Sequence, residues 1–227
     1  MASQLTYPPF HYIGNNGEPD GFEVALLQEV AKAGEFNITI QNTPRTLLEE
    51  TLNNDRVQIW SSTISINPER ATQMDFSQSF MHKDSRAIVL QDNEANQSLQ
   101  KAKDFKGKKI AINELSKGDR EAAMNLADSK NNLVVTPSYI TSIGSMLTGE
   151  TDAVLDNGLV LRNYLKKQKD LPSMRMILPS EENKDYAFAV KKGNAELLNK
   201  INQGLEKVKA DGTYQKLVEQ WFGDEKI

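Results

Sequence analysis

Strand patterns and helix patterns alternate along most of this chain of 227 residues, and this order constrains its fold more than any other feature. Short apolar runs at 110–112, 133–135 and 153–155 are separated by amphipathic stretches at 119–127 and 140–147. Strands that are joined through helices usually lie parallel in one sheet, because a parallel pair needs a long crossover connection. The sequence therefore predicts an α/β fold with largely parallel sheets.

Further elements are predicted on both sides of this region. Helices are expected at 23–33, near 47–52, at 158–168, from 194 and from 213, and strands at 36–41, 57–60, 87–90 and 186–190. Gly34 is expected to end the first helix, and Asn194 and Thr213 are expected to cap the last two. The segment 14–17 has the composition of a hairpin tip.

Composition excludes several kinds of chemistry. The chain has no cysteine and two histidines, so it cannot form a disulfide, a cysteine-containing zinc site or a three-histidine metal site. Any Ser–His–Asp triad would need His11 or His82. We predict no catalytic residues, no metal and no cofactor, although composition by itself excludes only the sites just named. Lysine and arginine number 27 against 31 acidic residues, a net charge of −4, and no basic patch indicates nucleic acid.

No segment of this chain is predicted to act as a membrane anchor or as a secretion signal. An apolar run of about 18 residues, which a membrane-spanning helix needs, does not occur. The first residues lead directly into Tyr7-Pro8-Pro9-Phe10 without the apolar region of a signal peptide.

The segment 61–70 carries the clearest functional pattern. Asn67 is a good helix N-cap, and Pro68 occupies the first helical position. Arg70 lies in the first turn, where the helix dipole disfavours a cation unless it faces an anion. Hydroxyl groups of Thr63 and Ser65, together with free backbone N–H groups, would complete a carboxylate site.

A simpler interpretation of Arg70 is also open. The side chain can be a surface cation that pairs with Glu69 or Asp75. The pattern within this segment does not decide between the two interpretations.

Several motifs together resemble one known family. They are Ser-Ile-Asn-Pro-Glu-Arg at 65–70, Met-Asp-Phe-Ser at 74–77, Tyr-Pro-Pro-Phe at 7–10, Gly-Phe-Glu-Val at 21–24, Asp-Phe-Lys-Gly-Lys-Lys-Ile-Ala-Ile at 104–112 and Lys-Ala-Asp-Gly-Thr-Tyr at 209–214. In this order they resemble the amino-acid-type extracytoplasmic solute-binding proteins (family 3), which feed ATP-driven (ABC) importers. The resemblance extends over nearly the whole chain.

The resemblance implies a two-lobed periplasmic-binding-protein fold of type II. Lobe one would comprise 1–84 plus 186–227 and lobe two 85–185, with two hinge-crossing strands and a ligand in the cleft that the lobes close. The expected partners are an amino acid or related small carboxylate and an ABC permease. The protein is expected to be a monomer that acts in the periplasm or outside the cell, secreted or lipid-anchored, and to make or break no bond.

The family's site residues map onto four positions of lobe one. The resemblance implies that Arg70 pairs bidentately with the ligand α-carboxylate. It implies that Thr63 offers a backbone carbonyl, that Ser65 offers a hydroxyl, and that Tyr7 stacks on the ligand side chain. Without the resemblance, Tyr7 could equally be a surface aromatic beside two prolines.

Other positions depart from the family pattern. The aspartate that usually pairs with the ligand ammonium is replaced by Asn157, with Asp156 one residue earlier, and either can take the role. In the anion loop of lobe two, Ser116 keeps a hydroxyl and Lys117 adds a charge that either faces the ligand or is solvated. Arg45 replaces a second aromatic wall or is simply exposed. Two cations facing the cleft would favour a ligand with an extra anionic group, or one without the ammonium.

Two departures concern the start of the chain. Gln4 stands where many family members have an acidic residue. The strand that normally precedes Ala2 is missing or reduced to 2–5, which leads us to expect a shortened chain.

Two other functions fit the same resemblance. A cyclohexadienyl-dehydratase-like enzyme uses this fold and needs a carboxylic acid with a raised pKa, for which Glu114 is the candidate. The chain can also be the ligand-binding sensory domain of a larger receptor.

Overall fold

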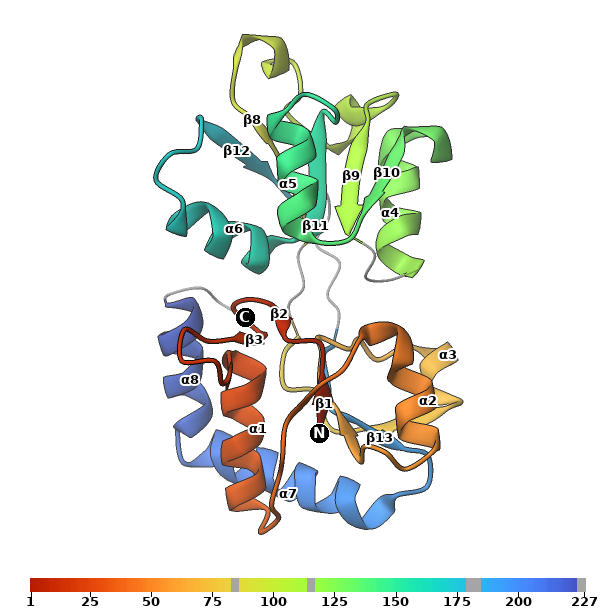
Figure 1. The fold of residues 1–227 in the computed structure, drawn as a ribbon, viewed down its shortest axis with the longest axis vertical. Helices are drawn as coiled ribbons and strands as arrows, with labels where there is room; N and C mark the ends of the chain where they lie inside the picture. Colours follow the sequence, from red (N-terminus) through yellow and green to blue (C-terminus); the bar gives the residue numbers. More distant parts are fainter. Residues whose placement is uncertain (83–85, 114–116, 179–184, 224–227) are drawn as a thin grey trace. The chain divides into compact units, whose positions relative to one another are not determined.

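The computed structural model describes residues 1–82, 86–113, 117–178 and 185–223, and these form two compact units (Figure 1). Unit 1 comprises Met1–Lys83 and Asn183–Ile227, and unit 2 comprises Asp84–Glu182. Because unit 1 contains both ends of the chain, the chain passes between the units twice. The predicted hinge-crossing strands fall largely on 83–85 and 179–184, which lie outside the described residues.

Unit 1 contains a mixed sheet of five strands in the order β5-β1-β6-β13-β7. The strands are β1 (Ala2–Ser3), β5 (Gln41–Asn42), β6 (Ile59–Trp60), β7 (Met74–Phe76) and β13 (Ala189–Lys191). β1 runs parallel to β5 and β6, whereas β13 is antiparallel to β6 and β7. A second, antiparallel sheet contains β2 (Thr6–Tyr7), β3 (His11–Ile13) and β4 (Pro19–Asp20). The hairpin predicted at 14–17 joins β3 to β4, with the Gly14 N–H donating to the Glu18 carbonyl.

Three of the helices of unit 1 pack closely against one another. The helices of this unit are α1 (Phe22–Ala33), η1 (Arg45–Leu47), α2 (Leu48–Asn53), α3 (Pro68–Ala71), α7 (Ala195–Ala210) and α8 (Thr213–Phe222). α1 packs against α7 and α8 (Figure 1). Gly204 permits the α1–α7 contact, because a Cβ at this position would lie 2.3 Å from the Val30 carbonyl oxygen. The buried rings of Phe10 and Phe22 lie in the core of this unit.

Three predicted helix ends are confirmed and one is wrong. Gly34 ends α1, the Asn194 side chain caps α7, and the Asn67 side chain caps α3 by accepting from the Arg70 N–H at 2.8 Å. Thr213 is not a cap but the first residue of α8. Gly212 takes the cap position, at φ 82°, because glycine adopts this left-handed conformation without steric cost.

The strand predicted at 36–41 is mostly absent, since β5 begins at Gln41. Half-buried and exposed side chains still alternate over 36–40, as they would in a strand. However, β1 pairs with this segment only from Ala2, which lies opposite Gln41. Before Gln41, the Met1 amino group donates to the Thr39 carbonyl at 2.7 Å.

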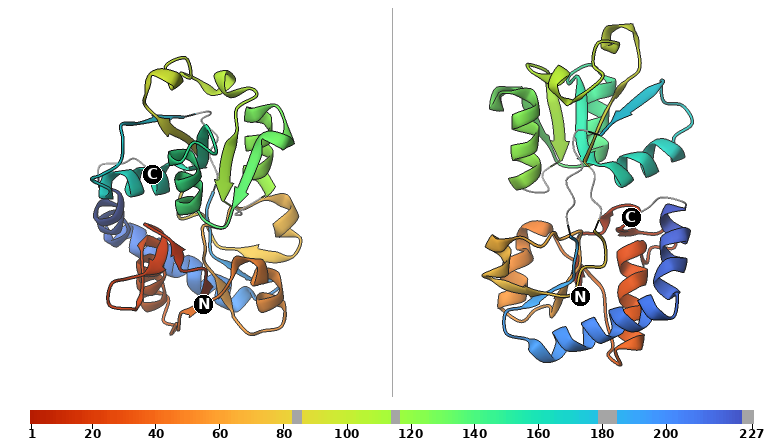
Figure 2. Two further views of the ribbon diagram at one scale, coloured as in Figure 1. Left: turned by 45° about the horizontal axis from the view of Figure 1, so that its top comes forward. Right: turned by 180° about the vertical axis from the view of Figure 1, so that it is seen from behind.

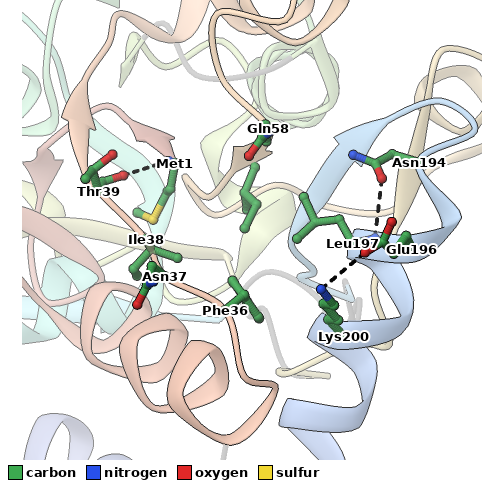
Figure 3. Close-up of a pocket in the computed structure, with 11 residues that line it drawn as sticks. Met1, Phe36, Asn37, Ile38, Thr39, Gln58, Asn194, Glu196, Leu197 and Lys200 are labelled. Atoms are coloured by element: carbon green, nitrogen blue, oxygen red, sulfur yellow. Dashed lines mark hydrogen bonds and ion pairs between the residues drawn. The ribbon is translucent and has the colours of Figure 1, made fainter.

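A cavity of about 330 Å³ lies beside Met1, bordered by 36–39, 58–59 and the start of α7 (Figure 3).

Unit 2 contains a second mixed sheet of five strands in the order β10-β9-β11-β8-β12. The strands are β8 (Arg86–Gln91), β9 (Ile110–Asn113), β10 (Leu133–Thr136), β11 (Ala153–Asn157) and β12 (Met174–Ile177). β9, β10 and β11 are parallel, whereas β8 is antiparallel to β11 and β12. The sequence did not predict β12, whose side chains are all half-buried.

The helices of unit 2 pack around this sheet (Figure 2). They are η2 (Glu94–Asn96), η3 (Ala102–Phe105), α4 (Lys117–Ala127), η4 (Lys130–Asn132), α5 (Tyr139–Leu147) and α6 (Gly158–Lys167). The core includes Ile88, Phe105, Ile110 and Leu155. In both units, no helix among the described residues is long and apolar enough to cross a bilayer.

Candidate ligand-binding site

The loop that follows β6 in unit 1 is built from three consecutive buried residues, Ser61, Ser62 and Thr63. The Glu23 carboxylate of α1 contacts this loop. Ser61 Oγ donates to Glu23 Oε2 at 2.6 Å, and the Thr63 backbone N–H donates to Glu23 Oε1 at 2.8 Å. Thr63 has φ 47°, a left-handed conformation that is rare for a β-branched residue. A buried carboxylate thus holds the loop in a conformation that threonine does not favour on its own.

Arg70 of α3 is directed toward the same loop. One terminal nitrogen, Nη1, donates to both the carbonyl and the hydroxyl of Ser65, each at 3.0 Å. Asp75, the alternative partner, instead forms an ion pair with Lys192 at 2.7 Å. A guanidinium carries five N–H donors in a planar fork that matches a carboxylate. Arg70 therefore lies beside the Ser65 hydroxyl with which the sequence grouped it, and also beside the Ser65 carbonyl.

Arg45 of η1 also contacts this loop. The side chain is half-buried, and its Nη1 donates to the Ser62 carbonyl. The charge of Arg45 also lowers the pKa values of His11 and Glu23, although burial has the larger effect on both. Arg45 is therefore directed toward the loop and the buried polar groups around it.

Tyr7 is buried, so it is not the surface aromatic of the alternative interpretation. Its ring stacks on Phe10, with centroids 6.2 Å apart, and lies 5.7 Å from the His11 ring. His11 Nδ1 lies 2.6 Å from the Gln4 carbonyl, which can only accept, so Nδ1 carries the proton. His11 Nε2 lies 3.4 Å from Ser62 Oγ. Tyr7 is thus linked to the loop through His11.

The buried ionisable groups of unit 1 have strongly shifted pKa values. Burial lowers the pKa of His11 to about 3, so its imidazole is neutral at pH 7. Burial raises the pKa of Glu23 to about 7, against the opposing effect of its hydrogen bonds with Ser61 and Thr63. The charged form of a carboxylate is disfavoured away from water unless donors compensate it. The sequence did not predict this role for Glu23, because an acid in the first turn of a helix ordinarily faces solvent.

In unit 2 the predicted residues lie at the carboxyl ends of parallel strands, where ligands bind in open α/β sheets. Asp156 and Asn157 end β11, and Asn113 ends the neighbouring β9. Asn113 Nδ2 donates to Asp156 Oδ2 at 2.5 Å, and the Asn157 N–H donates to Asp156 Oδ1 at 2.6 Å. The Asp156 carboxylate is buried and is held by these two donors.

The Asn157 side chain has a structural role. Its Oδ1 accepts from the backbone N–H groups of Leu159 at 2.8 Å and Val160 at 3.2 Å, so Asn157 is the N-cap of α6. Of the two candidates for the ammonium, Asp156 therefore carries the negative charge, whereas the oxygen of Asn157 is engaged by the helix.

Two further residues near this edge were not predicted from the sequence. Tyr139 begins α5, and its pKa is raised to about 12, mainly by burial and then by the nearby Tyr164 and Asp156. Arg86 begins β8, is buried, and lies directly opposite Asn157 in the antiparallel pair. The sequence offered one signal for Tyr139, which is its position directly after Ser138, the N-cap of α5.

The remaining predicted residues are Glu114, Ser116 and Lys117. Ser116 and the candidate acid Glu114 lie outside the described residues. Lys117 is the first residue of α4, but its side chain is not described. Within the described parts of the chain, no group of three or more histidine and acidic side chains is arranged to hold a metal ion. The cavity beside Met1 includes none of the predicted site residues.

Comparison with known proteins identifies the family. Residues 1–224 match the family of bacterial extracellular solute-binding proteins, family 3. The chain is 28% identical to the L-cystine-binding protein TcyJ of Escherichia coli, over 96% of this chain and 80% of that protein. It is also 28% identical to ABC transporter arginine-binding protein 1 of Escherichia coli, over 96% of this chain and 87% of that protein.

Solved structures of the same kind share the fold. The arginine-, lysine-, histidine-binding protein ArtJ of Geobacillus stearothermophilus matches with a TM-score of 0.86 at 26% identity, over 99% of this chain and 95% of that one. An ancestral arginine-binding protein bound to arginine matches with a TM-score of 0.86 at 28% identity, over 98% and 96%. The α/β fold in two lobes is therefore the periplasmic-binding-protein fold, and this chain belongs to the bacterial extracellular solute-binding proteins of family 3.

Proposed function

We propose that this protein captures an amino acid or a related small carboxylate and delivers it to an ABC permease, without chemical change. The observation that carries this proposal is the arrangement of Arg70, whose guanidinium lies 3.0 Å from the hydroxyl and carbonyl of Ser65 beside the strained Thr63. Relatives that are named for arginine or cystine binding support the ligand class. The names of relatives that belong to ABC transporters support the importer as the partner.

Each lobe is proposed to hold one charged end of the ligand. In unit 1, Arg70 would pair with the α-carboxylate, while Thr63 and Ser65 supply a carbonyl and a hydroxyl. The Tyr7 ring would pack on the ligand side chain. In unit 2, we assign the ammonium to Asp156, because its carboxylate is charged and is held at the end of β11 by Asn113.

The anion loop of lobe two is proposed to add Ser116 and Lys117. Arg45 acts differently in this proposal: since it donates to the Ser62 carbonyl, it supports the loop from the side. With this assignment the site keeps an acceptor for the ammonium, which favours an α-amino acid over a carboxylate that lacks it. We infer that the lobes, 1–84 plus 186–227 and 85–185, close on the ligand by a hinge motion of a monomeric protein, in the periplasm or outside the cell.

A ligand panel tests this function directly. Thermal-shift assays with the standard amino acids and small carboxylates, followed by titration calorimetry of each hit, should give at least one ligand that binds in the micromolar range or more tightly. A charge-assisted bidentate pair contributes about 3 kcal/mol to binding. Arg70→Ala should therefore lower the affinity for that ligand by about 100-fold or more.

The matched control is Arg56→Ala, which removes an exposed arginine of the same unit. This control should bind like the unmodified protein. The proposed function is wrong if no compound in the panel stabilises the protein, and the proposed role of Arg70 is wrong if both variants bind equally well.

A further inference from the structure

We propose that Glu23 is a positioning residue of the ligand site: its carboxylate holds Thr63 in the left-handed conformation that aims the loop after β6 at the ligand. This inference rests on the proposed function, because it concerns the loop that would contact the ligand. Glu23 itself is fully buried in α1 and is not proposed to touch the ligand.

The first argument is the strain at Thr63. Its φ of 47° is sparsely populated by β-branched residues, and such a conformation persists only when the surrounding structure enforces it. Two hydrogen bonds do so here. The Thr63 N–H donates to Glu23 Oε1 at 2.8 Å, and the Thr63 hydroxyl donates to the Ser62 carbonyl at 2.8 Å. Of these two, the bond to Glu23 is the one that ties the loop to another element.

The second argument is the place of Thr63 in the chain. Two residues later, Ser65 supplies both the carbonyl and the hydroxyl that accept from Arg70. A change of backbone direction at Thr63 would therefore displace the acceptors that orient Arg70. One residue earlier, the Ser62 carbonyl accepts from Arg45. The loop is thus fixed between two arginines, with Glu23 as its buried anchor.

The third argument is the chemistry of the anchor. Glu23 uses one oxygen for Thr63 and the other for Ser61, so a single buried side chain holds the loop at two points. Arg45 is the cation whose field favours the ionised form. The other buried titratable group near the loop, His11 of β3, is neutral at pH 7. Because burial raises the pKa of Glu23 to about 7, its ionisation can be followed near neutral pH.

Two substitutions separate the hydrogen bond from the space that Glu23 fills. Glu23→Gln keeps an acceptor for the Thr63 N–H, and Glu23→Met keeps the length of the side chain but not the acceptor. For a ligand found in the panel, we expect Glu23→Gln to bind within about threefold of the unmodified protein and Glu23→Met to bind at least about tenfold more weakly. Glu29→Gln, in the same helix but paired with Lys32 at the surface, is the control and should change nothing.

A rescue experiment distinguishes positioning from general destabilisation. Glycine adopts the left-handed conformation without steric cost, so Thr63→Gly should relieve the need for the anchor. In a Thr63→Gly background, the additional loss of affinity from Glu23→Met should shrink to about threefold or less. An undiminished loss in that background would contradict the positioning role.

A measurement on the unmodified protein keeps the proposal testable even if Glu23→Met does not fold. The backbone amide proton of Thr63, followed by NMR between pH 5 and 9, should titrate with a midpoint near 7, and Glu23→Gln should abolish this titration. A Thr63 amide shift that is the same in Glu23→Gln as in the unmodified protein at every pH, or a folded Glu23→Met that binds like the unmodified protein, overturns the proposal. If the unmodified protein binds no panel compound, the proposed function fails and the positioning role fails with it, whereas the titration still reports the Glu23–Thr63 contact.

Discussion

Asp156 and Asn157 are neighbours in the chain but have different tasks in the structure. Asp156 holds a buried carboxylate that accepts from Asn113 and from the Asn157 N–H. The side-chain oxygen of Asn157 accepts hydrogen bonds from backbone N–H groups in the first turn of α6. The two positions therefore predict opposite effects on stability and on binding.

Substitutions at these two positions test the distinction. Asn157→Ala removes a helix cap and should lower the free energy of unfolding by about 1 kcal/mol. Asn157→Asp keeps a capping oxygen and should be close to neutral for stability. Asp156→Asn keeps the shape of the side chain but loses its charge, so it should lower the affinity for an amino acid by about tenfold or more. Chemical denaturation and calorimetry measure the two effects, and a large loss of affinity in Asn157→Ala with none in Asp156→Asn would reverse the assignment.

At the residue level, local chemistry was predictable and burial was not. Asn67 and Pro68 were correctly placed at the start of α3 because capping depends on a few neighbouring residues. The buried state of Glu23 depends on residues about 40 positions away in the chain. The electrostatic effect of Asp156 on the pKa of Tyr139 likewise depends on how α5 packs beside β11. No sequence period reports such contacts.

At the scale of elements, the close contact between α1 and α7 depends on glycines, with Gly204 the one inside a helix. A Cβ at position 204 would lie 2.3 Å from the Val30 carbonyl oxygen, a backbone atom that cannot rotate away. Gly144 in α5 offers a contrast, because a Cβ at that position would meet nothing within 4 Å.

We therefore expect opposite results from the same substitution. Gly204→Ala should lower the free energy of unfolding by about 2 kcal/mol or more, since it forces α1 and α7 apart. Gly144→Ala should raise it by up to about 1 kcal/mol, because alanine favours the helix. Urea denaturation measures both. A neutral Gly204→Ala would mean that the two helices are less closely packed than described.

The two wrong predictions at this scale concern a strand and a helix cap, and both depend on a neighbouring part of the chain. The pattern at 36–41 is that of a strand, but a strand needs a neighbour, and β1 pairs with this segment only at Gln41 and Asn42. At α8, Thr213 has the chemistry of a cap, but Gly212 reaches the left-handed conformation more easily. Helices with long amphipathic patterns, such as α7, were predicted correctly because many residues agree.

At the scale of the whole molecule, Glu23 and His11 give stability an unusual dependence on pH. Burial raises the pKa of Glu23 from 4.5 to about 7, so its contribution to stability is lost as pH rises through this range. Burial lowers the pKa of His11 from 6.5 to about 3, so its contribution is lost as pH falls below 6.5. Between pH 4.5 and 6.5 the two trends oppose each other.

Single substitutions should uncover each trend. In His11→Gln, the free energy of unfolding should rise as pH falls from 7 to 5, because Glu23 alone remains. In Glu23→Gln, it should fall over the same range, because His11 alone remains. Each group contributes a slope of at most about 1.4 kcal/mol per pH unit. Urea denaturation at several pH values measures the slopes, and equal slopes in the two variants would contradict these burial effects.

The central claim is that Arg70 binds the carboxylate of the ligand. The most direct test is calorimetry of the tightest-binding amino acid and its α-carboxamide, each with the unmodified protein and with Arg70→Ala. We predict that the unmodified protein prefers the acid by about 100-fold and that Arg70→Ala loses most of this preference. Equal affinity of the unmodified protein for acid and amide, or a preference that survives in Arg70→Ala, would contradict the claim.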